Sequence, residues 1–261
     1  MQKKMQKKEQ GSAQSVPSAS KEKALFIIAI ACAIVFAGSM QTACFIKKGW
    51  PEMEHLKTDK MTAYMNKKYK EKFTFAGSFG GQLGKDYSMI YVESEERPGM
   101  FALVRCEETK SGEIFTDNYA AILKKAEIEA LLRPAAEEIY GECKLFFKVP
   151  ELVLPENYQA DITAEEFLER EESLAQIYLF PKEKREASRE EKEAGLTSFC
   201  EISRQKGYLF RGVVSYPKSP EDYEMIRESN FVTCGYEGYQ AFEEIIFSME
   251  KHGGFRYMKW L

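Results

Sequence analysis

The longest stretch without a charged side chain covers residues 24–46 and is dominated by apolar residues. As a helix it spans roughly 35 Å, which is enough to cross a hydrocarbon core of about 30 Å. Lys47 and Lys48 close the stretch, and Trp50 stands where an aromatic ring favours the lipid headgroups. We therefore expect a transmembrane helix at 24–46, with the lipid bilayer as one partner of the chain.

Two other interpretations of this stretch stay open. A signal peptide could be cleaved after Ser39, because small residues stand at 37–39, although the apolar run that continues to Ile46 favours an uncleaved signal anchor. The residues before Cys44 resemble the end of a bacterial lipobox, but Gln41 occupies the place of the usual aliphatic residue. We favour the signal anchor and expect no acylation of Cys44.

Basic residues on either side of the anchor predict its orientation. Residues 1–23 contain six lysines and two glutamates and have few large apolar side chains, whereas four lysines follow the anchor up to Lys60. Positive charge is retained on the cytoplasmic side of a membrane. We expect 1–23 to be a disordered basic cytoplasmic tail and the C-terminal domain of this single-pass cell-membrane protein to be extracytoplasmic.

Beyond the anchor, the apolar positions predict a helix and then a series of strands. Residues 47–71 carry a loose apolar stripe among lysines, which is typical of a helical stalk. Short alternating runs separated by glycine and proline then predict an antiparallel meander. These runs read KFTFAGSFGG, YSMIYVES, MFALVRCEE and KSGEIF.

The next segment predicts one helix followed by one strand. The helix begins near Tyr119, after Asp117 or Asn118 as its cap, and ends at Gly141, with Pro134 expected to kink or split it. Its expected apolar face holds Ile122, Ala126, Leu131, Ala135 and Ile139.

The run CKLFFKV after this helix predicts a buried strand. We assign 72–150 to a first α+β half in which one helix covers the sheet. Leu103 and Leu145, on the two most apolar strands, should then point at that helix.

The second half, residues 151–261, also places helices against strands. A capping box begins at Thr163, a long charged helix is expected from about Lys184 to Gln205, and Ser219 should cap another helix. LAQIYLF and YLFRGVVSY predict strands. Residues 239–252 fit a helix or a strand, and we favour a terminal strand pair. The predicted fold class is α+β, with a mostly antiparallel sheet and covering helices.

Charge excludes one class of partner. The chain of 261 residues has a net charge of −4, and the tail carries +4, so the part beyond the anchor carries −8. An acidic domain does not favour nucleic acid, because phosphate binding needs clustered Lys and Arg.

Motifs for catalysis or metal binding are weak. His55 and His252 are far apart, so we predict no metal site and no histidine-based catalytic pair. The glycine-rich run that begins at Gly77 departs from the phosphate-loop pattern at Phe79 and Asp86, and it predicts a turn or bulge. We assign no catalytic, cofactor-binding or metal-ligating residue and predict no cofactor.

Cysteines and carboxylates leave alternatives open. Cys106, Cys143, Cys200 and Cys234 can form disulfides outside the cell or remain buried thiols. Neighbouring glutamates point to different faces of a strand or helix, so we expect solvated faces, as for the run SREEKEAG. The adjacent pairs begin at Glu95, Glu107, Glu165 and Glu171. Tyr236 and Tyr239 beside glycines fit a packed turn better than a sugar platform.

The stretches YMNKKYKEKFTFAGSFGGQLG and YGECKLFFKVPE resemble small, functionally uncharacterised, single-pass membrane-anchored proteins of Gram-positive bacteria. The resemblance covers roughly residues 64–151, and it implies no site residue. We expect a non-enzymatic interaction or accessory module of the cell envelope, with a protein or cell-wall partner. The alternative is a cell-envelope hydrolase that acts on peptidoglycan or peptide through carboxylates.

Overall fold

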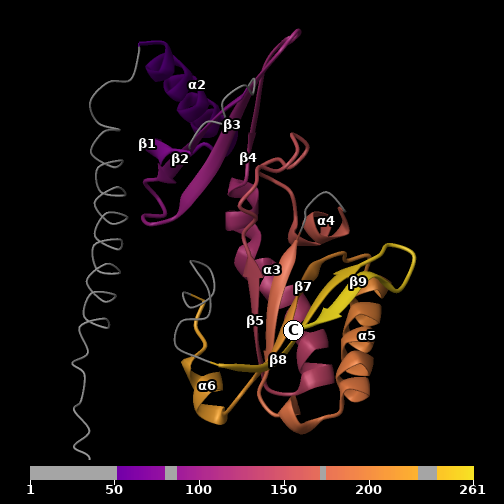
Figure 1. Ribbon diagram of the computed structural model, residues 1–261. Helices are drawn as coiled ribbons and strands as arrows, with labels where there is room; N and C mark the ends of the chain where they lie inside the picture. The colour runs from indigo at the N-terminus through magenta and orange to yellow at the C-terminus, as the bar shows by residue number, and fades with distance from the viewer. Residues whose placement is uncertain (1–51, 80–86, 171–174, 229–239) are drawn as a thin grey trace, which may run out of the picture. The chain divides into compact units, whose positions relative to one another are not determined.

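The computed structural model describes residues 52–79, 87–170, 175–228 and 240–261. Figure 1 draws these residues as coloured ribbon, and Leu56–Leu261 form one compact unit. The expected tail (1–23), the expected anchor (24–46) and the possible cleavage site lie outside the described residues. Within the described ranges, no helix is both long enough and apolar enough to cross a membrane.

Sheet A is an antiparallel meander in the order β1-β2-β3-β4, as the alternating runs predict. Its strands are β1 (Phe73–Ser78), β2 (Tyr87–Ser94), β3 (Phe101–Thr109) and β4 (Gly112–Asp117). The register shifts between Phe75 and Gly77, so the predicted bulge occurs where the glycine-rich run begins. The rest of that run, residues 80–86, lies outside the described part of the chain.

Helix α2 (Glu52–Tyr69) packs on sheet A. Met61, Met65 and Tyr69, which share one helix face, are buried in a cluster with Phe73 and with the inward side chains of β2 and β3. Ion pairs join Lys57 to Glu108 and Lys60 to Glu113. The helix expected as a stalk is therefore part of the folded domain from Leu56 onward.

Asp117, at the end of β4, fastens α2 to the sheet. Its carboxylate accepts hydrogen bonds from Lys68 Nζ at 2.7 Å, Tyr69 OH at 2.6 Å and Tyr64 OH at 2.9 Å. It also accepts the backbone N–H of Tyr119, the first residue of the next helix, at 2.8 Å. Of the two caps that the sequence left open, Asn118 holds the N-cap position, but its side chain makes no capping hydrogen bond. One buried carboxylate thus links a helix, a strand and the start of the next helix.

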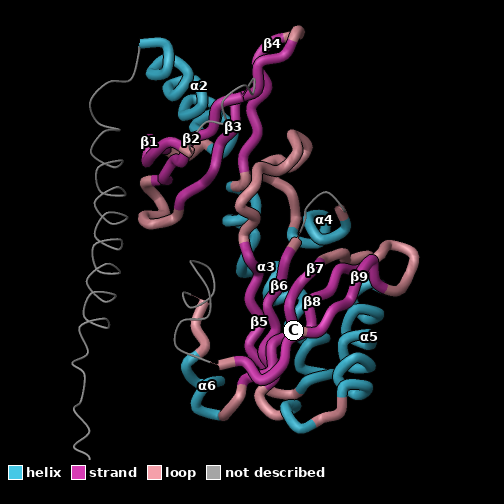
Figure 2. Tube along the Cα trace, viewed as in Figure 1, coloured by secondary structure: helices cyan, strands magenta, loops and turns pink. Residues whose placement is uncertain are grey.

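Sheet B has five strands in the order β5-β6-β7-β8-β9. They are β5 (Cys143–Lys148), β6 (Gln176–Pro181), β7 (Arg211–Pro217), β8 (Ala241–Met249) and β9 (Phe255–Trp260). The β6–β7 pair is parallel and the other pairs are antiparallel, so sheet B is mixed. Figure 2 colours its strands magenta and the neighbouring helices cyan. The strand pair at the C-terminus is confirmed, and the fold class is α+β.

The assignment of CKLFFKV to the first sheet is wrong. Strand β5 pairs with β6 as the edge of sheet B and makes no pair with the strands of sheet A. Most buried residues of helix α3 (Tyr119–Tyr140) likewise share a core with β5, whereas its first residue, Tyr119, is buried with the strands of sheet A. An apolar strand pattern does not identify the partner strand, because pairing is decided by packing between segments distant in the sequence.

Leu103 and Leu145 consequently lie in different surroundings. Leu145 is buried in the core that β5 shares with α3, as predicted. Leu103 is also buried, but alternation along β3 places it on the face opposite Ala102 and Val104, away from the cluster beneath α2. It is not a member of the core that Leu145 shares with α3, so the two leucines do not pack in one core as expected.

Helix α3 runs unbroken through Pro134, so the expected split does not occur. Residues on both sides of the proline are buried against sheet B and its helices, and this packing holds the helix together despite the lost backbone hydrogen bond. Of the expected apolar face, Ala135 is buried, Ile122, Leu131 and Ile139 are partly buried, and Ala126 is exposed. The buried residues of α3 are Tyr119, Ala120, Ala121, Ile128, Leu132, Ala135, Ala136 and Tyr140.

Three further helices surround sheet B, and each begins with a serine or threonine cap. They are α4 (Ala164–Glu169), α5 (Arg189–Gln205) and α6 (Pro220–Met225). Thr163 and Ser188 form complete capping boxes, and the Ser219 side chain accepts the Asp222 N–H. The charged helix therefore starts at Arg189, later than expected, after a short 3₁₀ helix at Lys184–Glu186.

Gly212 allows the parallel pair β6–β7 to form. A Cβ at this position would lie 2.4 Å from the carbonyl oxygen of Ile177, its partner across the pair, and 2.8 Å from the Ile177 side chain. Backbone cannot yield to such a contact, so only glycine fits here.

Candidate functional site

A cavity of about 280 Å³ lies where α3, α5 and β7 come together. Helix α5 connects the parallel strands β6 and β7, so its N-terminus lies at the carboxyl end of β6. Ligands of sheets with parallel strands usually bind at this edge. The lining includes Ile139, Tyr140, Glu191, Lys192, Gly195 and Tyr216.

Two buried tyrosines contribute to the lining of this cavity. Tyr140 is the last residue of α3 and Tyr216 lies near the carboxyl end of β7; their exposed fractions are 3% and 0%. Neither hydroxyl has a hydrogen-bond partner in the described part of the chain. Buried hydroxyls are normally paired, because an unpaired one loses its bonds to water without replacement.

Both hydroxyls stay protonated. Burial raises the pKa of Tyr140 well above its usual value, and the neighbouring Tyr216 raises it further. Burial also raises the pKa of Tyr216, with an added effect from the carboxylate of Glu243. Each hydroxyl can therefore both donate and accept a hydrogen bond at any physiological pH.

Lys192 forms a charged wall of the cavity. Its side chain is 1% exposed, and Nζ donates to the backbone oxygen of Arg185 at 2.7 Å and to Oε2 of Glu243 at 2.7 Å. The ammonium group also lies 4.6 Å from the centre of the Tyr216 ring, a favourable cation–π arrangement. The buried lysine is thus held by two oxygen acceptors of the fold and by an aromatic ring.

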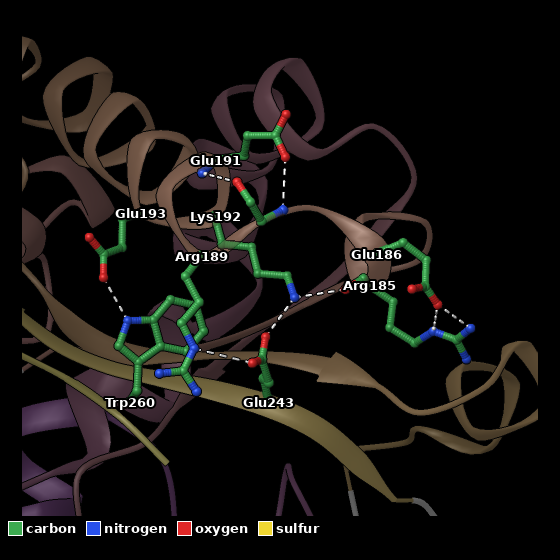
Figure 3. A network of polar contacts seen from close by, with 9 residues as sticks. Arg185, Glu186, Arg189, Glu191, Lys192, Glu193, Glu243 and Trp260 are labelled. Carbon is green, nitrogen blue, oxygen red and sulfur yellow. Dashed lines mark hydrogen bonds and ion pairs between the residues drawn. The ribbon is translucent and has the colours of Figure 1, made fainter.

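Figure 3 shows how this ion pair extends across the surface of α5. Arg189 Nε donates to Oε1 of Glu243 at 3.3 Å, and its guanidinium group lies over the ring of Trp260. Trp260, at the end of β9, donates its indole N–H to Glu193 at 2.6 Å. Hydrogen bonds from Lys192 and Arg189 hold the pKa of Glu243 below its usual value, the Lys192 bond being the larger cause.

The remaining acidic group of the lining is also engaged. Glu191 accepts the backbone N–H of Ser188 at 2.8 Å as part of the capping box of α5. The charges around the cavity are therefore balanced within the fold, and its unengaged groups are two neutral hydroxyls. Such an arrangement can bind a polar molecule through hydrogen bonds.

The sequence interpretation missed Lys192, which lies in the run SREEKEAG that was expected to be a solvated surface. A periodic signal was present: Leu196, Phe199 and Ser203 follow Lys192 at helical spacing, and all are buried. A lysine in line with an apolar stripe can therefore mark a buried charge. Tyr140 and Tyr216 had no comparable signal, because α3 and β7 meet only in the folded chain.

The described histidine and cysteine residues that the sequence analysis considered do not line this cavity. His252 is in the turn before β9, and nothing is described of the His55 side chain. Cys106, Cys143 and Cys200 are buried free thiols, whereas Cys234 lies outside the described residues. In the parts that the structure covers, no group of three or more potential metal ligands occurs.

The glutamate pairs have ordinary structural roles. Glu95 pairs with Lys72, Glu108 pairs with Lys57, and Glu166 completes the capping box of α4. Glu171, Glu172, Tyr236 and Tyr239 lie outside the described residues.

No protein-family model matches the chain, and no curated protein has a matching sequence. A crystal structure of a DUF5037 family protein from Ruminococcus gnavus ATCC 29149 is similar at 15% sequence identity. The similarity covers 77% of this chain and 94% of that chain, with a TM-score of 0.40. A likeness at this level assigns neither a family nor a function.

Proposed function

We propose that the chain is a membrane-tethered interaction or accessory module of the bacterial cell envelope, which acts by binding. In this proposal residues 24–46 form the anchor and the α+β domain lies on the outer face. The apolar segment and the basic tail before it support the tether, and an acidic domain argues against nucleic acid as the partner. A protein or cell-wall component is the expected partner.

The observation that carries the binding role is the pair of buried hydroxyls at the cavity. Leaving one polar group buried without a partner costs about 1–3 kcal/mol, and folds rarely retain that cost without a use. A ligand that hydrogen-bonds to Tyr140 and Tyr216 recovers it. Phenylalanine would fill the same space without the penalty, so the hydroxyls serve binding rather than packing.

Replacing Tyr140 and Tyr216 with phenylalanine is therefore expected to stabilise the ligand-free protein. Each change should raise the free energy of unfolding by about 1–3 kcal/mol, because it removes a buried group without a partner. Urea unfolding of the full chain, purified in a mild detergent and followed by near-UV circular dichroism, measures this.

The matched control is Tyr69→Phe. It removes the same atom from a buried tyrosine, but that hydroxyl donates to Asp117 at 2.6 Å, so stability should fall. If Tyr140→Phe and Tyr216→Phe also lose stability, their hydroxyls are already satisfied and the binding role of the cavity is wrong.

The tether and its orientation predict a protease result. Treatment of intact, wall-stripped cells should digest the domain and leave a small N-terminal fragment in the membrane, because only the domain is exposed outside. Permeabilised cells provide the control for the protected fragment. Complete protection of the domain in intact cells would contradict the outer location.

The hydrolase alternative requires two carboxylates that face each other across one cleft. In the described part of the cavity lining, the acidic residue is Glu191, which caps α5. Glu243 nearby is held by Lys192 and Arg189. The geometry therefore favours the binding module.

A further inference from the structure

We infer that the cavity between α3, α5 and β7 takes a small uncharged molecule that carries an amide or hydroxyl group and an apolar edge. This inference rests on the proposed binding role, because it names the class of ligand for that same cavity.

The volume of the cavity limits the size of the ligand. The cavity measures about 280 Å³, just below the range of roughly 300–1,000 Å³ that is usual for small-molecule pockets. A compound of a few heavy atoms, or the end group of a longer one, fits this space.

The polar groups set the second limit. The hydroxyls of Tyr140 and Tyr216 are protonated and neutral, and each can donate and accept. An amide or a hydroxyl has the same double capacity, so either can pair with a tyrosine hydroxyl as donor or as acceptor.

The charges set the third limit. The ammonium group of Lys192 is balanced by Glu243 at 2.7 Å, and Glu191 is engaged by the N-terminus of α5. An entering anion or cation would find no free counter-charge there to offset the hydration that it loses on entry. Charged ligands are therefore disfavoured.

The walls require an apolar edge on the ligand. Ile139, Ala187, Ala194 and Gly195 line the cavity beside the two aromatic rings. Gly195 also keeps the space open, since a Cβ built there would lie 3.5 Å from Ile139 and 3.7 Å from the Tyr140 ring. Alanine is accommodated at this distance, whereas a leucine would extend into the cavity.

The test uses three probes of similar size and different charge: propanamide, propionate and propylammonium. Saturation-transfer NMR on the detergent-purified full chain should detect propanamide with wild-type protein and with Gly195→Ala. The signal should be lost with Gly195→Leu, which separates binding in the cavity from partition into detergent. Tyr140→Phe and Tyr216→Phe should each weaken propanamide binding about threefold to tenfold, the loss expected for one neutral hydrogen bond.

The possible failures are distinct. Binding of propionate or propylammonium that Gly195→Leu abolishes would overturn the uncharged class but leave the binding role intact. If no probe gives a signal that depends on residue 195, the ligand class is wrong. The free energies of unfolding of Tyr140→Phe and Tyr216→Phe then test the binding role separately. A gain in stability shows that the hydroxyls lack partners and keeps the binding role, whereas a loss removes it.

Discussion

Replacing Asp117 with asparagine is expected to lower the free energy of unfolding by about 3–5 kcal/mol. The Asp117 side chain is fully buried and that of Lys68 is 9% exposed, with 2.7 Å between Nζ and Oδ2. Asparagine keeps the size of the side chain but removes the charge, so the ammonium group is left in the interior without its counter-ion. The hydroxyls of Tyr64 and Tyr69 lose a charged acceptor at the same time.

The loss should be measured by urea unfolding of the full chain, with Glu113→Gln as the matched control. Glu113 pairs with Lys60 at 2.9 Å from the same helix to the same sheet, but both side chains are well exposed to solvent. Exposed pairs contribute at most about 1 kcal/mol, so this variant should stay close to the parent protein. Equal losses for the two variants would show that burial does not set the strength of the Asp117 contact.

The effect is large because Asp117 joins segments that are remote in the chain. It accepts hydrogen bonds from α2 and from the backbone of Tyr119, while Asn118 beside it accepts the N–H of Leu103 at 2.8 Å. A typical domain is stable by about 5–15 kcal/mol, so loss of this contact removes a considerable part of the total. We expect α2 to detach from sheet A first, because its ion pairs at Lys57 and Lys60 lie at the surface.

Local sequence patterns predicted most elements of this fold. The alternation in YSMIYVES and the serine and threonine caps at Thr163 and Ser219 act over a few residues, and the structure has the expected strand and helices at those places. The meander of sheet A was also predictable, since neighbouring strands joined by short turns usually pair. These features depend on contacts close in sequence.

The errors concern contacts between distant segments. The strand CKLFFKV has an apolar pattern that suits either sheet, and its pairing with β6 depends on residues more than 25 positions away. Pro134 disfavours a continuous helix locally, but the buried residues around it keep α3 intact. Lys192 looked solvated because the charged residues around it hide its place on the apolar face of α5.

The candidate site could not be predicted for the same reason, because its residues are distant in the sequence. Tyr140 ends a helix, and Tyr216 lies near the end of a strand 76 residues later in the chain. Nothing in either local pattern indicates that they share a cavity. Gly195 is the one visible irregularity in α5, where a glycine costs up to about 1 kcal/mol relative to alanine. Gly195 lies beside Tyr140, and the absence of a side chain there leaves the cavity open, which accounts for a glycine at this position.

Glu243→Gln should be as damaging as the change at Asp117, with a loss of about 3–5 kcal/mol. The Lys192 side chain is 1% exposed, whereas that of Glu243 is 19% exposed. Removing the carboxylate leaves a buried ammonium group unpaired. The reverse change, Lys192→Met, leaves a carboxylate that reaches water and still contacts Arg189, so it should cost clearly less.

The difference in stability between the two single variants would show that the buried Lys192 charge depends on Glu243 more than the Glu243 charge depends on Lys192. The double variant Lys192→Met with Glu243→Gln should recover most of the loss caused by Glu243→Gln, because no buried charge remains. Equal losses for the two single variants, without recovery in the double variant, would contradict the burial argument. Urea unfolding of the four proteins at neutral pH gives the comparison.

The pH dependence provides a second measure of the same pair. The hydrogen bond from Lys192 lowers the pKa of Glu243 below the ordinary value of 4.5, so the folded protein holds this carboxylate ionised more strongly than the unfolded chain does. The resulting stability is fully present above the unfolded pKa and is lost as the pH falls through the folded pKa. Glu243→Gln has no such contribution, so its free energy of unfolding should fall less steeply than that of the parent as the pH decreases below about 4.5. Parallel curves for parent and variant in this range would show that the Lys192–Glu243 contact does not stabilise the fold.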